Sequence, residues 1–294
     1  MMPAAAAPPS SSPGWWQWRR RAAPARAQSS TLHRRRCVAA SAPASGRISP
    51  DMAERETTEA FASRGALTTV EERVAPQRTA LIVVDMQNDF CAPGGYIDGI
   101  GKDVSGLAAI VPPLNGLLAQ ARRVGVPVVW LTACYEEHEI PPSMITQRRR
   151  IGASAVCCER GSWGAGFFGV SPEPGEVVFE KHTYSGFSNP GLGRHLQALG
   201  REALVFAGVQ TNVCVESTLR EAHSRGFDVA IVQDAVASHA ATQHQATLAN
   251  VGFLFGDVIT AEVVARAWAA PPASVVAMEE HSQVSDALLP GGNR

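Results

Sequence analysis

The sequence lacks the features that would place it in a membrane or in a disulfide-bonded scaffold. It contains no run of about 18 uncharged apolar residues, the length a membrane-spanning helix needs, so we expect no membrane association. Its six cysteines form no C-x-x-C pair, and no two histidines lie at zinc-ligand spacing. We therefore predict neither a zinc site nor a disulfide framework. The 294 residues, 45% hydrophobic and 18% charged, suit one globular domain of about 200 residues with extensions.

Acidic residues are missing from the first 50 positions, which contain eight arginines, no lysine and many alanines, serines and prolines. This composition is typical of a disordered transit peptide, and the prolines disfavour the helix of a mitochondrial presequence. We predict a chloroplast transit peptide over 1–50, and the alternative is mitochondrial targeting. A basic tail that binds nucleic acid is the less favoured interpretation. Removal of residues 1–40 would change the net charge from −1 to −8, so we expect no nucleic-acid partner.

The rest of the chain alternates short apolar runs with helical patterns. We predict a polar N-terminal extension over 51–74, an α/β domain over 75–268 and a C-terminal tail over 269–294. Buried strands are expected at 80–84, 127–132, 177–179, 203–207, 229–232 and 258–259, and helices at 111–124, 192–199 and 213–225. This alternation indicates a three-layer α/β/α domain, in which helices cover both faces of a mostly parallel sheet. The segment 134–176, rich in proline, glycine and charge, is interpreted as a lid over the active site or as a partly mobile connection.

Three reactive side chains fall at the carboxyl ends of predicted strands, where parallel sheets form their sites. They are Asp85, Lys181 and Cys214. Singly, each has an ordinary explanation: a loop-capping acid, a solvated lysine and a small buried hydrophobe. Together they indicate a nucleophilic thiol, because a helix N-terminus and an ammonium group would lower its pKa. The carboxylate would accept the thiol proton and later activate water.

Three segments then resemble the signatures of the isochorismatase-like cysteine hydrolases: 83–90, 179–187 and 208–216. The resemblance extends over about 79–267. It implies a six-stranded, Rossmann-like parallel sheet, an Asp85–Lys181–Cys214 triad, a homo-oligomer and no cofactor. It also implies a cis peptide between Val209 and Gln210, which would aim the backbone N–H groups of Gln210 and Cys214 at a developing oxyanion.

Within that family the chain is most similar to the ureidoacrylate amidohydrolases, at 93–96, 161–163, 184–186 and 212–220. The similarity implies that a small ureido or carbamoyl compound is cleaved at a C–N bond through a thioester. The alternatives are biuret- or carbamoyl-amine-type hydrolysis, nicotinamidase or isochorismatase activity, or an idle homologue that serves as a binding protein. The sequence departs from the subgroup in the lid, at 133–138 and 141–150, and at Gln210.

Substrate-binding residues are predicted from this subgroup as Asn88, Phe90, Tyr135 and Tyr184, with core packing as the alternative for Phe90 and Tyr184. Trp163 is a weaker candidate, and His239 and His244 are interpreted as surface residues.

Two further motifs are considered as signs of a bound metal and of a bound dinucleotide, and neither supports one. Related nicotinamidases bind a metal through Asp-x-His, but here Asp98 is followed by Gly99 and Ile100, so no metal is predicted. A G-x-G-x-x-G match at 164–169 follows no strand and is interpreted as lid glycine.

Overall fold

The computed structural model describes residues 67–154 and 156–269. The predicted transit peptide, positions 51–66 of the predicted extension and positions 270–294 of the predicted tail lie outside these residues. The described part contains a six-stranded sheet in the order β3-β2-β1-β4-β5-β6, and every pairing is parallel. The strands are β1 (Thr79–Val84), β2 (Val128–Ala133), β3 (Val177–Lys181), β4 (Ala203–Val209), β5 (Asp228–Ala237) and β6 (Asp257–Ile259). The predicted α/β class and parallel sheet are confirmed.

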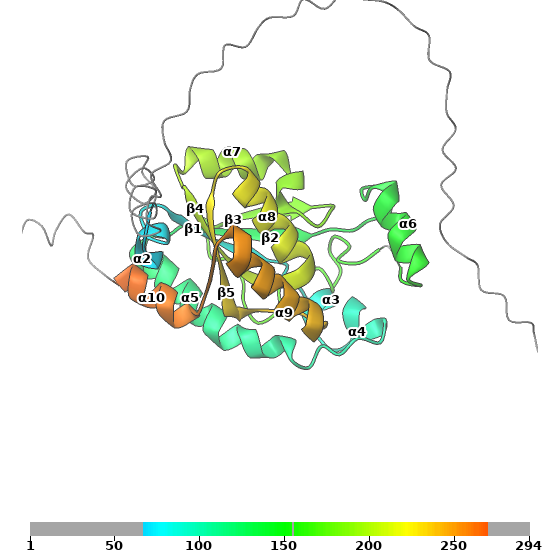
Figure 1. Ribbon diagram of the computed structural model, residues 1–294. Coiled ribbons are helices and arrows are strands. Elements are labelled where there is room, and N and C mark those ends of the chain that lie inside the picture. The colour runs from blue at the N-terminus through cyan, green and yellow to red at the C-terminus, as the bar shows by residue number, and fades with distance from the viewer. Residues whose placement is uncertain (1–66, 155, 270–294) are drawn as a thin grey trace, which may run out of the picture. The chain divides into compact units, whose positions relative to one another are not determined.

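Helices cover both faces of the sheet (Figure 1). One face packs against α5 (Val111–Val124) and α10 (Ala261–Ala269). The other packs against α7 (Pro190–Ala198), α8 (Glu216–Ser224) and α9 (Ala241–Asn250). The remaining helices are α2 (Val70–Arg73), α3 (Asn88–Cys91), α4 (Tyr96–Gly99), η1 (Leu107–Ile110), α6 (Pro142–Arg150), η2 (Gly186–Ser188), η3 (Thr211–Val215) and η4 (Val251–Phe255). None of these described helices is long and apolar enough to cross a membrane.

Strand β1 shows why the sheet needs a helical layer on each side. Its six residues are all buried. Leu81 and Val83 belong to the core beneath α5 and α10, whereas Ile82 and Val84 belong to the core beneath α7 and α8. Successive strand residues point to opposite faces, so a continuous apolar run fills both layers, at about 1.5–3 kcal/mol for each large side chain buried.

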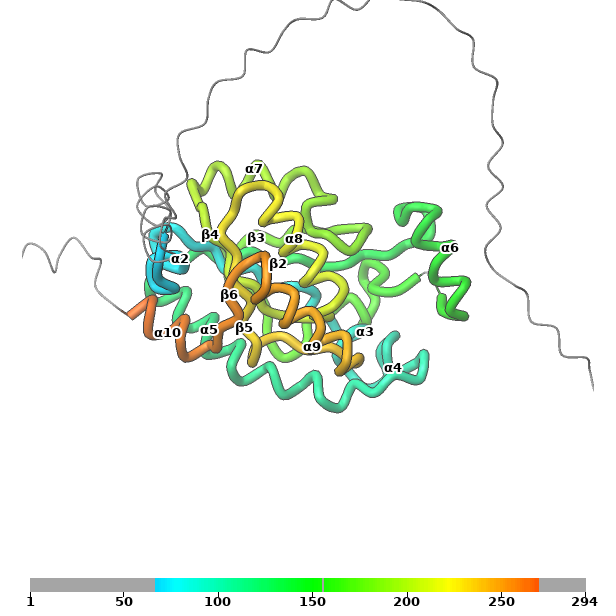
Figure 2. Tube along the Cα trace, in the orientation of Figure 1, coloured from blue at the N-terminus to red at the C-terminus, as the bar shows by residue number. Residues whose placement is uncertain are grey.

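Helix α6 forms within the lid, where the sequence predicted no helix. Pro142 begins this helix at a position where its missing N–H costs nothing, and three consecutive arginines end it. Its apolar positions are too few to give a helical period in the sequence. Figure 2 shows α6 together with α3 and α4 beyond the carboxyl end of the sheet.

The helix predicted at 213–225 begins two residues earlier. A π-helical turn, η3, precedes α8 without a break. Helix α2, inside the segment we assigned to an extension, packs on the domain through a bidentate pair between Arg73 and Asp257 at 2.7 and 2.8 Å. Trp268 of α10 also donates to the Val74 carbonyl at 2.8 Å. The folded unit therefore includes residues before position 75.

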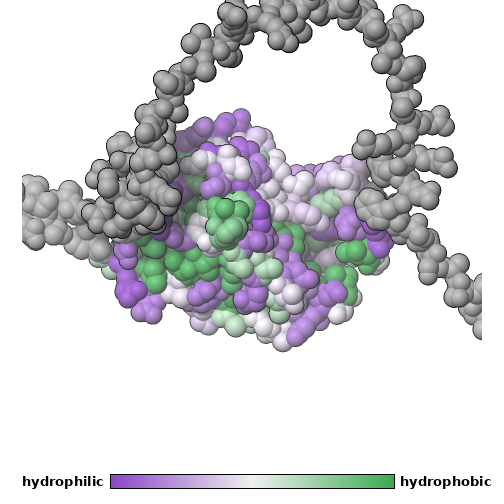
Figure 3. Space-filling view, viewed as in Figure 1, coloured by the Kyte–Doolittle hydropathy of each residue, from purple (hydrophilic) through white to green (hydrophobic). Residues whose placement is uncertain are grey.

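Exposed apolar side chains occur on the surface near α9. Phe253 and Leu254 of η4 are 78% and 66% exposed, and Figure 3 shows apolar atoms clustered on this face. Neighbouring exposed apolar residues are typical of contact surfaces. The homo-oligomer expected from the sequence stays a prediction.

Gly208 allows the two central strands to approach closely where the site begins. Its φ is 111°, and a Cβ at this position would lie 2.1 Å from the Val84 carbonyl oxygen. Only glycine adopts this conformation readily, and only glycine has the space.

We expect Gly208→Ala to lower the free energy of unfolding by about 2 kcal/mol or more, because it combines backbone strain with a steric clash. Gly116→Ala is the matched control, since Gly116 lies in the interior of α5 with nothing within 4 Å of its missing Cβ. That control should be neutral or stabilising. Urea denaturation of both variants checks the difference, and equal midpoints would contradict it.

Candidate active site

The structure brings Asp85, Lys181 and Cys214 together at the carboxyl edge of the sheet. Asp85 follows β1, Lys181 is the last residue of β3, and Cys214 lies in η3. Lys181 Nζ donates to Asp85 Oδ2 at 2.8 Å, and both residues are 0% exposed. Cys214 Sγ lies above this pair, 3.7 Å from the Tyr135 hydroxyl.

The Asp85 backbone turns sharply out of the strand. Its φ of 51° is in the left-handed region, which aspartate tolerates better than most residues. Its N–H donates to the Leu131 carbonyl at 2.8 Å, and its own carbonyl accepts from the N–H of Gln87, also at 2.8 Å. Asp85 is thereby held between the ends of β1 and β2.

Gln87 fixes the same corner and was not singled out by sequence reasoning. Its buried amide donates to the carbonyls of Ala133 and Ala165 and accepts from the Ala133 N–H at 2.8 Å. The first contact closes the end of β2, and the second ties down the lid at 163–166. A buried, fully paired amide of this kind fixes a unique arrangement.

The Cys214 thiol has a raised pKa, whereas the sequence predicted that the helix N-terminus and an ammonium group would lower it. Burial and the Asp85 carboxylate raise the pKa of Cys214 to about 12, and the Lys181 ammonium only partly opposes them. The first turn of a helix does favour negative charge, but here the thiol is excluded from water beside an existing anion. A neutral thiol has to lose its proton before it can act as a nucleophile.

The Asp85 carboxylate interacts with the thiol and can accept that proton. Burial raises the pKa of Asp85 above the ordinary carboxyl value, although Lys181 opposes the shift. A carboxylate with a higher pKa is a stronger base and accepts a proton more readily near neutral pH. Burial alone would lower the pKa of Lys181, but the Asp85 charge outweighs it and keeps the lysine an ammonium. Asp85 Oδ1 has no hydrogen-bond partner among the described residues, so one carboxylate oxygen is left for chemistry.

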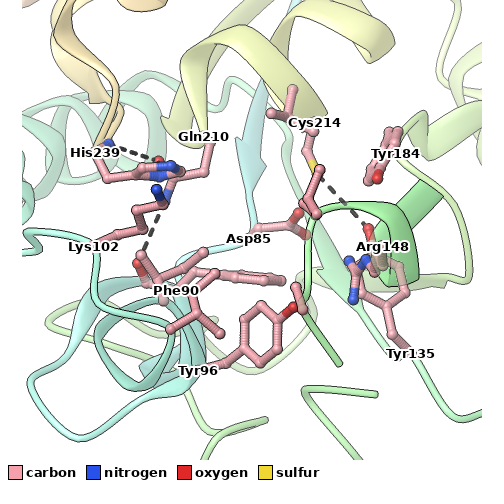
Figure 4. Close-up of a pocket in the computed structure, with 15 residues that line it drawn as sticks. Asp85, Phe90, Tyr96, Lys102, Tyr135, Arg148, Tyr184, Gln210, Cys214 and His239 are labelled. Atoms are coloured by element: carbon pink, nitrogen blue, oxygen red, sulfur yellow. Dashed lines mark hydrogen bonds between the residues drawn. The ribbon is translucent and has the colours of Figure 1, made fainter. Parts of the chain in front are cut away.

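The Val209–Gln210 peptide bond is cis, the bond for which the family resemblance implies that geometry. Val209 itself is buried in the core, whereas the Gln210 side chain forms part of a cavity wall. Its Nε2 donates to the Phe90 carbonyl at 3.3 Å, and its Oε1 accepts from the His239 N–H at 3.0 Å. The unusual glutamine thus joins α3 to the loop after β5 (Figure 4).

A cavity of about 190 Å³ opens above the Cys214 sulfur, with room for a small molecule. The predicted residues Phe90, Tyr135 and Tyr184 line it (Figure 4). Asn88 does not, because its amide donates instead to the Trp163 carbonyl at 2.8 Å and braces the lid. Trp163 is 59% exposed and lines no part of the cavity either.

Several cavity residues were missed from the sequence. They are Tyr96, Ile97, Ile100, Lys102, Arg148, Ile151, Ala153, Val213 and His239. Most come from α4, α6 and the adjoining loops, whose position over the site follows only from tertiary packing. His239 is half-buried in the wall, contrary to its assignment to the surface. Burial and the nearby Lys102 lower the pKa of His239, so it is neutral at pH 7.

Acidic side chains gather elsewhere, between the start of the lid and the end of β3, where Glu136, Glu139 and Glu180 lie within ligand distance of Cys134 or the neighbouring histidines. The Arg160 guanidinium donates to all three carboxylates. This arginine supplies the positive charge that the cluster requires. The cluster contributes no residue to the lining of the cavity.

Comparison with known proteins agrees with the geometry. The isochorismatase domain family matches residues 79–263, and the chain belongs to this family. It is 40% identical over 197 residues to a ureidoacrylate amidohydrolase of Methylobacterium radiotolerans, an alignment that covers 62% of this chain and 76% of that protein. A ureidoacrylate amidohydrolase of Klebsiella pneumoniae is 32% identical, with 71% and 94% covered. The crystal structure of a Pseudomonas syringae cysteine hydrolase superposes with a TM-score of 0.58 at 28% identity, covering 67% of this chain and 94% of that one.

The buried thiol should react slowly with iodoacetamide at pH 7, and the rate should rise with pH without a plateau below pH 9, because only the thiolate reacts. Asp85→Asn should accelerate this labelling at fixed pH, about tenfold for each unit by which the pKa falls, because it removes a negative charge and leaves the Lys181 ammonium. Labelling rates are read by mass spectrometry on the Cys214 peptide.

Asp228→Asn, at the opposite end of the sheet, is the control for this experiment and should label like the unmodified protein. Slower labelling of Asp85→Asn, or a plateau near neutral pH in the unmodified protein, would show that the thiol charge is set differently.

Proposed function

We propose that this protein is a hydrolase that cleaves a C–N bond in a small ureido or carbamoyl compound resembling ureidoacrylate. The observation that carries the proposal is the solvent-excluded Asp85–Lys181 pair directly beneath the Cys214 thiol, on the floor of a cavity that suits a small molecule. The ureidoacrylate amidohydrolases at 32–40% identity support the substrate class.

In the first half of the reaction, Asp85 takes the proton of Cys214 as the sulfur adds to the ureido carbonyl carbon. The backbone N–H groups of Gln210 and Cys214 stabilise the oxyanion that forms. The C–N bond then breaks, and the amine leaves with the proton from Asp85. A carbamoyl thioester remains on Cys214.

In the second half, Asp85 removes a proton from water, which attacks the thioester carbonyl. The Cys214–carbon bond breaks, and the sulfur recovers its proton from Asp85. The released carbamic acid decomposes to ammonia and carbon dioxide. Lys181 stays an ammonium group throughout and holds the carboxylate in position through its 2.8 Å hydrogen bond.

The rival interpretation is a catalytically idle homologue that binds a small molecule. The paired triad and the unbonded Asp85 Oδ1 favour the enzyme, because a binding protein has no need for a buried base beside a thiol. Within enzymes, biuret- and carbamoyl-amine-type reactions use the same chemistry, and a substrate panel separates them.

Cys214→Ala should reduce ammonia release from ureidoacrylate by about 10⁴-fold or more, because the covalent route disappears. Cys91→Ala is the matched control, since Cys91 is equally buried but does not line the cavity. It should keep nearly full turnover. In rapid-quench mass spectrometry of the active protein, one carbamoyl group should appear on the Cys214 peptide. Substantial turnover by Cys214→Ala would refute the mechanism, and no turnover of any carbamoyl compound by the folded full chain would favour the binding protein.

A further inference from the structure

Arg148 is placed in the cavity by a part of the chain that departs from the expected lid sequence. It lies in the last turn of α6, yet it is 7% exposed, whereas its neighbours Arg149 and Arg150 are exposed. Arginine is almost never this buried unless its guanidinium has interaction partners. Figure 4 shows its guanidinium directed into the cavity, beside Tyr135 and Tyr184.

Aromatic rings hold the guanidinium in place. Its central carbon lies 4.7 Å from the centroid of the Tyr135 ring and 5.7 Å from that of Tyr96. Its Nη1 is 3.6 Å from the Cys157 sulfur. Tyr96 is itself fixed, because its hydroxyl donates to the Ser154 carbonyl at 2.7 Å. Stacking on aromatic rings orients the planar fork and keeps its charge.

The charge of the cavity wall is unbalanced in favour of an anion. Among the described residues that line it, Asp85 is the only acid, and Lys181 neutralises it. Lys102 and Arg148 are both cations, while His239 is neutral at pH 7. An anionic substrate would therefore be attracted, and a guanidinium recognises a carboxylate through two parallel hydrogen bonds.

The distance between the guanidinium and the nucleophile suits a short molecule. The Tyr135 ring contacts Arg148, and its hydroxyl lies 3.7 Å from Cys214 Sγ, so a single tyrosine side chain spans the gap. A three-carbon ureido acid has a similar length between its ureido carbonyl and its carboxylate, so it can reach from Cys214 to Arg148.

We propose that Arg148 is the residue that selects a carboxylate-bearing substrate, by pairing with that carboxylate while Cys214 attacks the ureido carbonyl. The assignment rests on the proposed function for the reacting end of the substrate. It makes α6 the specificity element of the site, which acts on binding and leaves the chemistry to the triad.

The kinetic test compares ureidoacrylate with its neutral methyl ester. Arg148→Met should raise the KM for ureidoacrylate about 10- to 100-fold, the loss expected for a hydrogen-bonded charged group, with a smaller change in kcat. Turnover of the ester should be nearly unchanged, and Arg148→Lys should recover part of the KM because it restores the charge. Arg150→Met, on the exposed side of the same helix, is the control and should resemble the unmodified protein.

A purely structural role for Arg148 predicts something different, namely an equal loss of kcat on both substrates. That outcome would overturn the proposal, as would a preference of the unmodified protein for the ester.

A second readout does not depend on turnover. Propionate should slow the iodoacetamide labelling of Cys214 in the unmodified protein and in Arg150→Met, but not in Arg148→Met, whereas neutral propionamide should protect none of them. If propionate fails to protect the unmodified protein, the carboxylate site is wrong. If protection depends on Arg148 but no ureido compound is hydrolysed, the proposed function fails and the carboxylate site stands.

Discussion

A lysine and an aspartate that are excluded from solvent face each other at the carboxyl edge of the sheet, and the surrounding structure is organised around them. Removing two charges from water costs several kcal/mol for each ion, and the cost is recovered only when the geometry is good and further hydrogen bonds are made. Lys181 meets this requirement with three acceptors: the Asp85 carboxylate, the Tyr135 hydroxyl and the Thr183 carbonyl. Three parallel strands, β1, β2 and β3, must end in the correct register for these groups to meet.

The same pair determines how the thiol behaves. Burial and the Asp85 carboxylate beside it raise the pKa of Cys214 and keep the sulfur protonated. Because Lys181 is paired with Asp85, the floor of the cavity is neutral overall, and the net charge of the wall comes from Arg148 and Lys102. In the proposed function the triad provides the chemistry, while residues from α6 and the loop after α4 select the molecules that bind.

Sequence reasoning succeeded where a local pattern has one physical solution. The apolar runs predicted the strands because a strand buried on both faces leaves little room for polar residues, and Gly125 ended the 111–124 helix at the predicted position. The same reasoning failed in the lid. Helix α6 has few apolar positions and three terminal arginines, so its sequence resembles a charged loop. Sequence reasoning also placed Asn88 in the cavity and His239 on the surface. Their actual positions depend on contacts with residues about 75 and 30 positions away in the chain.

The sequence by itself determined the α/β class, the reactive side chains at strand ends and the family, since strand periodicity and motif residues are local properties. Tertiary structure alone decided the protonation state of Cys214, because burial and the proximity of Asp85 raise its pKa against the effect of the helix and the lysine. It also decided that Arg148 lies inside the cavity, while the two arginines that follow it in the chain remain in solvent. A one-residue step along α6 turns a side chain by about 100°, so the packing of that single helix on Tyr96 and Tyr135 selects which arginine faces the cavity.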